Sequence, residues 1–186
     1  GETVTDIFAT TTTDEHGATS STTLTITING TNDAPIISLT GTDSAATTLT
    51  ETDAGLSTSG TLTLTDIDTT NIVSTSVVSV STSGLTTGLA PNNAQLLAML
   101  TANGNLTSSQ TTGPINWTFN SGSEAFNYLP VGETLVLTYT VKANDGVVDS
   151  NLQTITITIT GTNDAPVVVA DTNSVTEDTV LTATGN

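Results

Sequence analysis

The chain has 186 residues and a formal net charge of −17, because 18 acidic residues face a single lysine, Lys142, and a single histidine, His16. This charge excludes a protein that binds nucleic acid or an anionic membrane surface by electrostatic attraction. The absence of cysteine excludes disulfides, thiolate metal sites and cysteine nucleophiles. No apolar run approaches the roughly 18 to 20 residues of a membrane span, so membrane insertion is not expected.

The sequence of the first 35 residues is repeated near the end of the chain. Residues 1–35 align without a gap to residues 132–166, at an offset of 131, and fifteen of the 35 positions are identical. Both copies end in Gly-Thr-Asn-Asp-Ala-Pro. An internal repeat of this kind indicates a tandem array of modules.

The offset divides the chain into three parts. We interpret residues 1–35 as the last strands and linker of a preceding repeat, 36–166 as a complete repeat and 167–186 as the start of the next. Residues 1–30 then carry strands whose own module is incomplete, with unpaired edges. We expect them to dock head-to-tail on residues 167–186 of a neighbouring molecule, or on the edge of the main sheet.

Threonine makes up 46 of the 186 residues and favours strands with a solvated face. Several segments alternate threonine with apolar residues or carry aromatics between turn residues, which predicts strands. In chain order these segments are 23–28, 61–66, 115–120, 135–143 and 154–160. Several short strands separated by turn residues predict an all-β fold, an antiparallel cadherin-like or immunoglobulin-like β-sandwich with Greek-key connections.

Three segments depart from simple alternation. The run 72–81 changes parity at Val77 and Val78, which predicts a β-bulge or two successive strands. Residues 92–102 carry leucines at helical spacing after a proline, which predicts one short amphipathic helix in a connection. A second helical turn is predicted at 124–129.

The aspartate carboxylates are the candidate ligand groups of this chain. Asp66 and Asp68 lie two residues apart at a strand end, so both side chains are expected on the same side. Two carboxylates about 5 Å apart repel by about 3 kcal/mol at an effective dielectric of about 20, and only Lys142 could offset this. Oxygen ligands without cysteine, and with one histidine, match calcium best. We therefore predict that Asp66, Asp68 and Asp145 belong to a Ca²⁺ site.

The chain resembles the VCBS repeat, a cadherin-like module of large secreted bacterial adhesins related to the RTX proteins. The resemblance lies in GTLTLTDID (60–68), INWTFNSGSEAFNYLPVGETLVLTYTVKANDG (115–146) and ITITITGTNDAPVV (155–168), and it covers nearly the whole chain. The period of 131 residues is longer than is usual for the family, and the excess falls at 83–113. The resemblance implies an extracellular location at the bacterial cell surface, with type I secretion.

The resemblance also implies which residues bind calcium, at the junctions between adjacent repeats of the same chain. The first junction would use Asn32, Asp33, Asp66, Asp68 and Asp145, with Asn71 as a further candidate. The second would use Glu51, Asn163 and Asp164, and Glu177 would serve the module beyond. Because the second junction lacks its downstream Asp-x-Asp, we expect it to be incomplete or empty.

Three functions are weighed for this chain. The leading hypothesis is a calcium-stiffened extender repeat of a long adhesin that supports cell attachment and biofilm formation. The second is a module that binds carbohydrate or another ligand through the 83–113 insertion. The third is a threonine-rich face that contacts ice or mineral. No enzyme activity and no catalytic residue are expected, because a Ser-His-Asp triad would need His16, which lies in a polar loop.

Overall fold

The long strands form where threonine alternates with apolar residues, as β10 (Thr134–Asn144) and β11 (Gln153–Thr160) show. They pair antiparallel, with Leu135 opposite Ile159 and Tyr139 opposite Ile155. All four of these side chains are fully buried. The threonines between them lie on the outer face, as the period of two requires.

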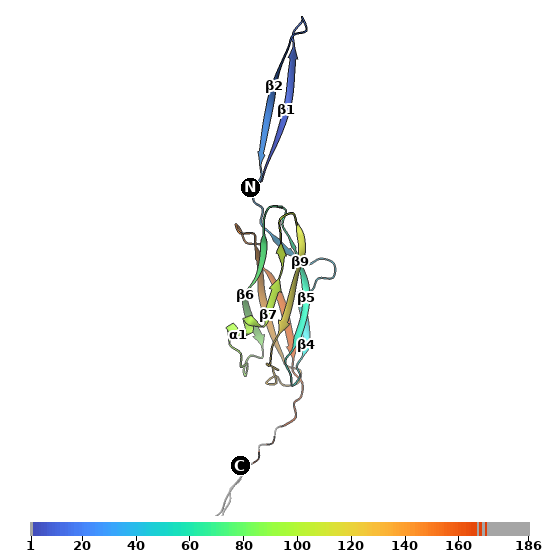
Figure 1. Ribbon diagram of the computed structural model, residues 1–186. Helices are drawn as coiled ribbons and strands as arrows, with labels where there is room; N and C mark the ends of the chain where they lie inside the picture. Colours follow the sequence, from blue (N-terminus) through green and yellow to red (C-terminus); the bar gives the residue numbers. More distant parts are fainter. Residues whose placement is uncertain (1, 167, 169, 171–186) are drawn as a thin grey trace, which may run out of the picture.

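The computed structural model describes residues 2–166, 168 and 170, arranged as a β-sandwich with a separate hairpin at its N-terminal end (Figure 1). The remaining elements are β1 (Thr3–Thr13), β2 (Thr19–Asn29), β3 (Ile36–Ser38), β4 (Ala46–Thr50), β5 (Ser57–Thr65), β6 (Val73–Gly84), α1 (Asn93–Ala98), β7 (Leu100–Asn103), β8 (Asn105–Leu106) and β9 (Thr112–Asn120). One sheet has the order β4-β11-β10-β6-β8 and the other β3-β5-β9-β7. The predicted all-β sandwich is confirmed. One pair differs from the antiparallel prediction, because β4 runs parallel to β11.

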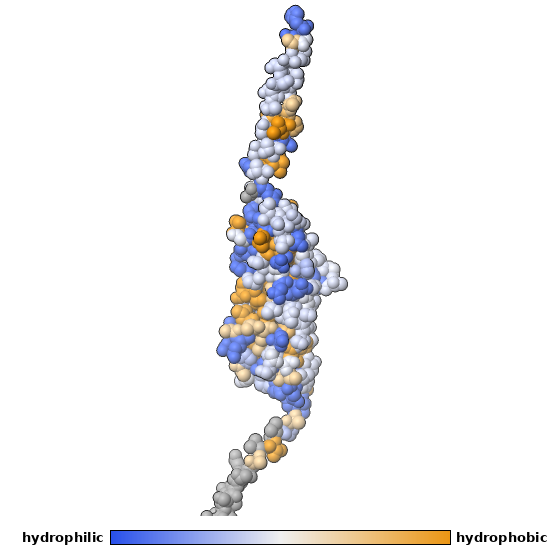
Figure 2. Space-filling model, viewed as in Figure 1, coloured by the Kyte–Doolittle hydropathy of each residue, from blue (hydrophilic) through white to orange (hydrophobic). Residues whose placement is uncertain are grey.

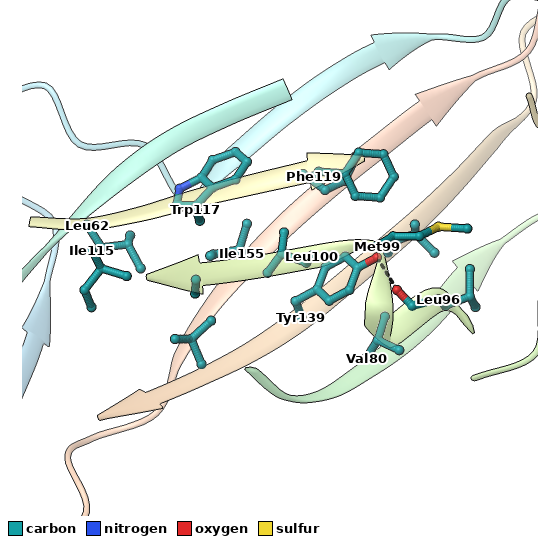
Figure 3. Close-up of a cluster of buried hydrophobic side chains, with 14 of the residues drawn as sticks. Leu62, Val80, Leu96, Met99, Leu100, Ile115, Trp117, Phe119, Tyr139 and Ile155 are labelled. Carbon is teal, nitrogen blue, oxygen red and sulfur yellow. Dashed lines mark hydrogen bonds between the residues drawn. The ribbon is translucent and has the colours of Figure 1, made fainter. Parts of the chain in front are cut away.

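The core lies between the two sheets of the sandwich (Figure 3). Its buried apolar side chains all lie between Ile37 and Ile159, so residues 36–166 contain a hydrophobic core of their own. The polar atoms of its aromatic residues are satisfied. Trp117 Nε1 donates to the Ser44 carbonyl at 2.8 Å, and the Tyr139 hydroxyl donates to the Leu96 carbonyl at 2.9 Å.

The parity change in β6 is a β-bulge within one strand. Thr140 pairs with Ser79 and Val141 with Val77, so Val78 is the extra residue between them. The predicted bulge is therefore confirmed at the position where the alternation fails.

The predicted helix at 92–102 is shorter than expected. Asn92 caps α1 in a capping box with Gln95, but the helix stops at Ala98. Leu100 already belongs to β7, where it pairs with Phe119 of β9. Strand pairing overrides the helical spacing of the leucines at this point. Among the described residues, no helix is long and apolar enough to cross a membrane.

The predicted helical turn at 124–129 was wrong. The segment forms tight turns in which Leu129 N–H donates to the Phe126 carbonyl at 3.0 Å. Phe126 has φ of 64°, in the left-handed region, and this conformation prevents a right-handed helix from continuing through it.

The hairpin β1–β2 reproduces the register of β10–β11 at the repeat offset. Val4 pairs with Ile28 and Phe8 with Leu24, as their counterparts do in the sandwich. Its apolar side chains are exposed, and Figure 2 shows them as orange patches along the hairpin. Among the described residues, the expected docking on the main sheet edge does not occur within one chain, since β1 and β2 pair with each other alone. Docking on residues 167–186 of another molecule stays a prediction, because nearly all of that segment lies outside the described residues.

Candidate metal site at the repeat junction

Three stretches of the chain meet at the end of the sandwich nearest the hairpin (Figure 1). They are the linker 30–35, the loop that follows β5 and the loop that follows β10. The two loops begin with Asp66 and Asp145, which are only 3% and 6% exposed. Two carboxylates are thus held largely out of solvent where the linker enters the sandwich.

Hydrogen bonds tie the linker to these acidic loops. Asn32 Nδ2 donates to Asp145 Oδ2 at 2.8 Å, and the Asp33 N–H donates to Asp68 Oδ2 at 2.7 Å. Asn71 Nδ2 donates to Asn32 Oδ1 at 2.9 Å and lies 3.4 Å from Asp145 Oδ2. The structure therefore brings together the residues predicted for the first junction, Asn71 included.

Asp145 is held in its ionised form by hydrogen bonds. Its Oδ1 accepts the N–H groups of Val147 and Val148, both at 2.7 Å. Burial opposes ionisation, but the bonds from Val148, Asn32 and Val147 outweigh it and hold the pKa of this carboxyl below its ordinary value. The site thus keeps a negative charge at neutral pH.

Asp66 is less well satisfied than Asp145. Its Oδ1 accepts the N–H of Asp68 at 3.0 Å, whereas its Oδ2 is buried without a hydrogen-bond partner. A buried, unpartnered carboxylate oxygen is costly. The one basic side chain of the chain, Lys142, is 2.7 Å from Asp149 and is engaged there. A bound cation would satisfy the Asp66 oxygen.

The acidic side chains alone do not form a metal cage. Across residues 2–166, no three Asp, Glu, His or Cys side chains gather closely enough to hold a metal ion by themselves. A cation here would need oxygens from Asn32, Asn71 or the backbone beside the carboxylates. Such mixed sets of carboxylate and carbonyl oxygens are what calcium accepts, with six to eight ligands.

Glu2 is a junction residue that sequence reasoning missed. Its Oε1 accepts the Thr69 hydroxyl at 2.9 Å, which links the hairpin directly to the loop after β5. The Gly30 N–H donates to the Glu2 carbonyl, just as the Gly161 N–H donates to the Glu133 carbonyl. Glu2 and Glu133 occupy matched positions in the 35-residue repeat, and this match was the available signal.

A second acidic group lies at the opposite end of the sandwich. Glu51 is 1% exposed, and its Oε1 accepts both the N–H and the hydroxyl of Thr162 at 2.8 Å. Its Oε2 is buried and has no hydrogen-bond partner in the part of the chain that the structure describes. Desolvation and the negative charges of Glu51 and Asp53 raise the pKa of Asp164.

The other residues predicted for the second junction add little to this group. Asn163 Nδ2 donates only to the Asp164 carbonyl, at 3.4 Å. Glu177 lies outside the described residues.

Other aspartates serve the fold. Asp14 Oδ1 accepts the N–H of His16 in the turn at the tip of the hairpin, far from the junction. Asp43 accepts the hydroxyls of Thr61 and Thr63 at 2.7 and 2.6 Å, and these bonds lower the pKa of its carboxyl. These carboxylates have their hydrogen bonds from the protein itself.

The chain has structural likenesses but no sequence match among known proteins. No protein-family model and no curated protein matches the sequence. Among solved structures, the PapD-like domain of human CEP192 matches with a TM-score of 0.41 and 13% identity, over 72% of this chain and 89% of that one. The CooA pilin subunit of enterotoxigenic Escherichia coli matches at 0.38 and 10%, over 72% and 100%. The AggA fimbrial subunit of Escherichia coli matches at 0.36 and 14%, over 73% and 100%. At these scores the likenesses carry no inference about function.

Proposed function

We propose that this chain is part of a tandem array of β-sandwich repeats in an extracellular bacterial adhesin, and that calcium stiffens the junctions between the repeats. The observation that supports the proposal most directly is Asp66 Oδ2, which is buried and has no hydrogen-bond partner among the described residues. Asp66 belongs to the loop after β5, which is already hydrogen-bonded to the linker through Asp68. The sequence repeat supports the tandem arrangement, since the linker Gly-Thr-Asn-Asp-Ala-Pro occurs at both ends of residues 36–166.

Calcium is the cation that fits these ligands best. The oxygens come from carboxylates, side-chain amides and the backbone, and the sequence contains no cysteine and one distant histidine, His16. Softer transition metals prefer sulfur and imidazole ligands. Magnesium requires near-octahedral geometry and keeps several waters, so an irregular set of loop oxygens favours calcium over it.

The geometry explains how a cation would stiffen the joint. Asn32 and Asp33 belong to the linker, whereas Asp66, Asp68 and Asp145 belong to loops of the sandwich. An ion bound to both groups fixes the linker on the end of the sandwich. Without the ion, the hydrogen bonds of Asn32, Asp33 and Asn71 must hold the linker against the repulsion between the carboxylates.

Thermal unfolding of the 186-residue chain in calcium, in magnesium and in EDTA tests the proposal. An ion that binds only the folded state adds about 2.7 kcal/mol at a hundredfold excess over its dissociation constant. We expect a melting temperature that rises in calcium and changes little in magnesium. Equal melting in calcium and EDTA, together with no heat of calcium binding by titration calorimetry, would refute the calcium site.

A ligand-binding role for the 83–113 insertion is the second candidate. It is favoured by a hollow of about 440 Å³ lined by Gln95 and Met99 of the insertion and by Asn120 and Glu124. Screening the chain against a glycan array tests it, with Gln95→Ala as the variant expected to lose any bound sugar. The absence of binding to any glycan would leave the extender function alone.

A further inference from the structure

The end of the sandwich that carries the acidic site also carries an apolar hollow. The hollow has a volume of about 450 Å³ and lies between the linker and the loop after β5. Its apolar lining residues are Ala34, Ile36 and Ile67. Thr65 and Thr111 also line it, and Asp33 and Asp66 of the acidic site form its remaining wall. Ile67 lies between Asp66 and Asp68 in the sequence, and its apolar side chain is 72% exposed. An apolar hollow beside a junction indicates a surface that a neighbour covers.

The neighbouring repeat can be located from the contacts of Glu2. Its side chain bonds to Thr69, two residues beyond Ile67, so the end of the preceding repeat reaches the rim of this loop. Glu2 corresponds to Glu133 by sequence offset, by strand register and by the shared bond to the linker glycine. The residues around Glu133 therefore show what the preceding repeat presents here.

An apolar turn precedes Glu133. The Glu133 N–H donates to the Pro130 carbonyl at 3.0 Å, which closes a turn over Pro130–Glu133. Within this turn the aliphatic side chain of Val131 is 69% exposed, so it is accessible to a neighbouring repeat. In the preceding repeat, the counterpart of Val131 would lie two residues before Glu2 itself.

We propose that the hollow at Ile36 and Ile67 receives the Pro130–Val131 turn of the preceding repeat. This contact rests on the proposed tandem arrangement and adds an apolar interface to the ionic one. Each repeat then carries the turn at one end and the hollow at the other, so the same contact recurs at every junction. The calcium site fixes the linker, and the turn in the hollow fixes the direction in which the next repeat points.

A protein of two directly joined copies of residues 36–166 tests the contact. The join reproduces the native junction, since Gly-Thr-Asn-Asp-Ala-Pro then precedes Ile36 of the second copy as it does in the chain itself. Residues 36–166 hold all the buried apolar core. The chain has no cysteine, so Ser81→Cys in each copy gives two spin labels on the exposed face of β6, and their distance distribution measures the stiffness of the joint.

Ile67→Thr in the second copy should broaden the distance distribution by at least about twofold in calcium, because repeats move independently once their interface is lost. Ile72→Thr is the matched control, since Ile72 is 69% exposed at the same end but does not line the hollow. Val131→Thr in the first copy should broaden the distribution equally, and the double variant with Ile67→Thr no further.

The calcium and EDTA arms separate this inference from the proposed function. If calcium narrows the distribution of the parent protein but Ile67→Thr behaves like Ile72→Thr, the hollow is not the docking site and the calcium-stiffened joint stands. If Ile67→Thr and Val131→Thr broaden the distribution equally with and without calcium, while calcium itself changes nothing, the docking contact stands and the calcium function falls. Melting of each variant as a single repeat confirms that the exposed substitutions leave the fold intact.

Discussion

Asp66→Asn should change the stability of the chain with opposite signs in EDTA and in calcium. In the absence of a cation, Asp66 Oδ2 is a buried oxygen without a partner, beside Asp68 and with Asp145 on the adjacent loop. A buried unpartnered group costs about 1 to 3 kcal/mol, and repulsion from the other carboxylates adds to this. Asparagine removes the charge and keeps an Oδ1 that accepts the Asp68 N–H.

The free energy of unfolding in EDTA should therefore rise by about 1 to 3 kcal/mol. Removing the charge removes a repulsion of about 3 kcal/mol from a carboxylate about 5 Å away at an effective dielectric of about 20, whereas the buried asparagine Nδ2 still lacks a hydrogen-bond partner and keeps part of the original penalty. For a chain of this size the melting temperature rises by about 2 to 4 °C for each kcal/mol. In calcium the same substitution removes a ligand and forfeits the increment from binding, about 2.7 kcal/mol at a hundredfold excess of the ion.

Circular dichroism melts in EDTA and across a calcium titration measure both signs. Asp43→Asn is the control, because Asp43 is bonded to Thr61 and Thr63 and should lose the same stability with or without calcium. A variant at Asp66 that loses equal stability in both conditions would show that this carboxylate serves only its bond to Asp68, and the reasoning would be wrong.

Three further predictions follow from other contacts. The pKa of Asp145 lies below its ordinary 3.8, so its ionised form stabilises the fold above that pH, and this contribution is lost as the pH falls further. The urea midpoint of Asp145→Asn should therefore fall less steeply below pH 3.8 than the midpoint of the parent protein. Gly60→Ala should cost about 1 to 3 kcal/mol in urea unfolding followed by tryptophan fluorescence, because a Cβ there collides with the Trp117 indole. Glu2→Ala should change stability by less than about 0.5 kcal/mol, since the contact with Thr69 is exposed, yet the ¹⁵N relaxation of the hairpin should show more independent motion.

The strands could be predicted from the sequence because alternation is a local signal that burial then enforces. Ile155, Ile157 and Ile159 were expected on one face and are fully buried. The bulge at Val78 was visible for the same reason, since an extra residue must shift the alternation by one. These features depend on neighbours in the sequence.

Structural features that depend on residues far apart in the sequence could not be predicted from local patterns. The helix ends at Ala98 because Leu100 pairs with Phe119, nineteen positions further along the chain. The parallel pairing of β4 with β11 joins residues that are 110 positions apart, such as Ala46 and Thr156, and no local pattern encodes its direction. Tertiary pairing decided both outcomes.

The candidate site could likewise be predicted from the sequence only in part. The charge imbalance led to the prediction that a cation offsets Asp66 and Asp68, whereas their approach to the linker at Asn32 and Asp33 was expected only from the family resemblance. The aspartates also sit differently from the expected strand geometry, since the Asp68 N–H turns back onto Asp66. Glu2 was missed because a single exposed glutamate carries no signal until the repeat is read as a structural equivalence.

The topology is compatible with the proposed extender function, in which the repeat carries tension between its two linkers. The N-terminal linker enters at one end of the sandwich and the chain leaves at the other (Figure 1). β4, near the start of the repeat, lies parallel to β11, its last strand, from Ala46 opposite Thr156 to Thr50 opposite Thr160. Tension on the two linkers pulls these strands in opposite directions along their length. Their ladder of hydrogen bonds is then loaded in shear, so the bonds resist together and are not opened one at a time. The proposed extender would need this resistance within each repeat as much as it needs stiffness at each junction.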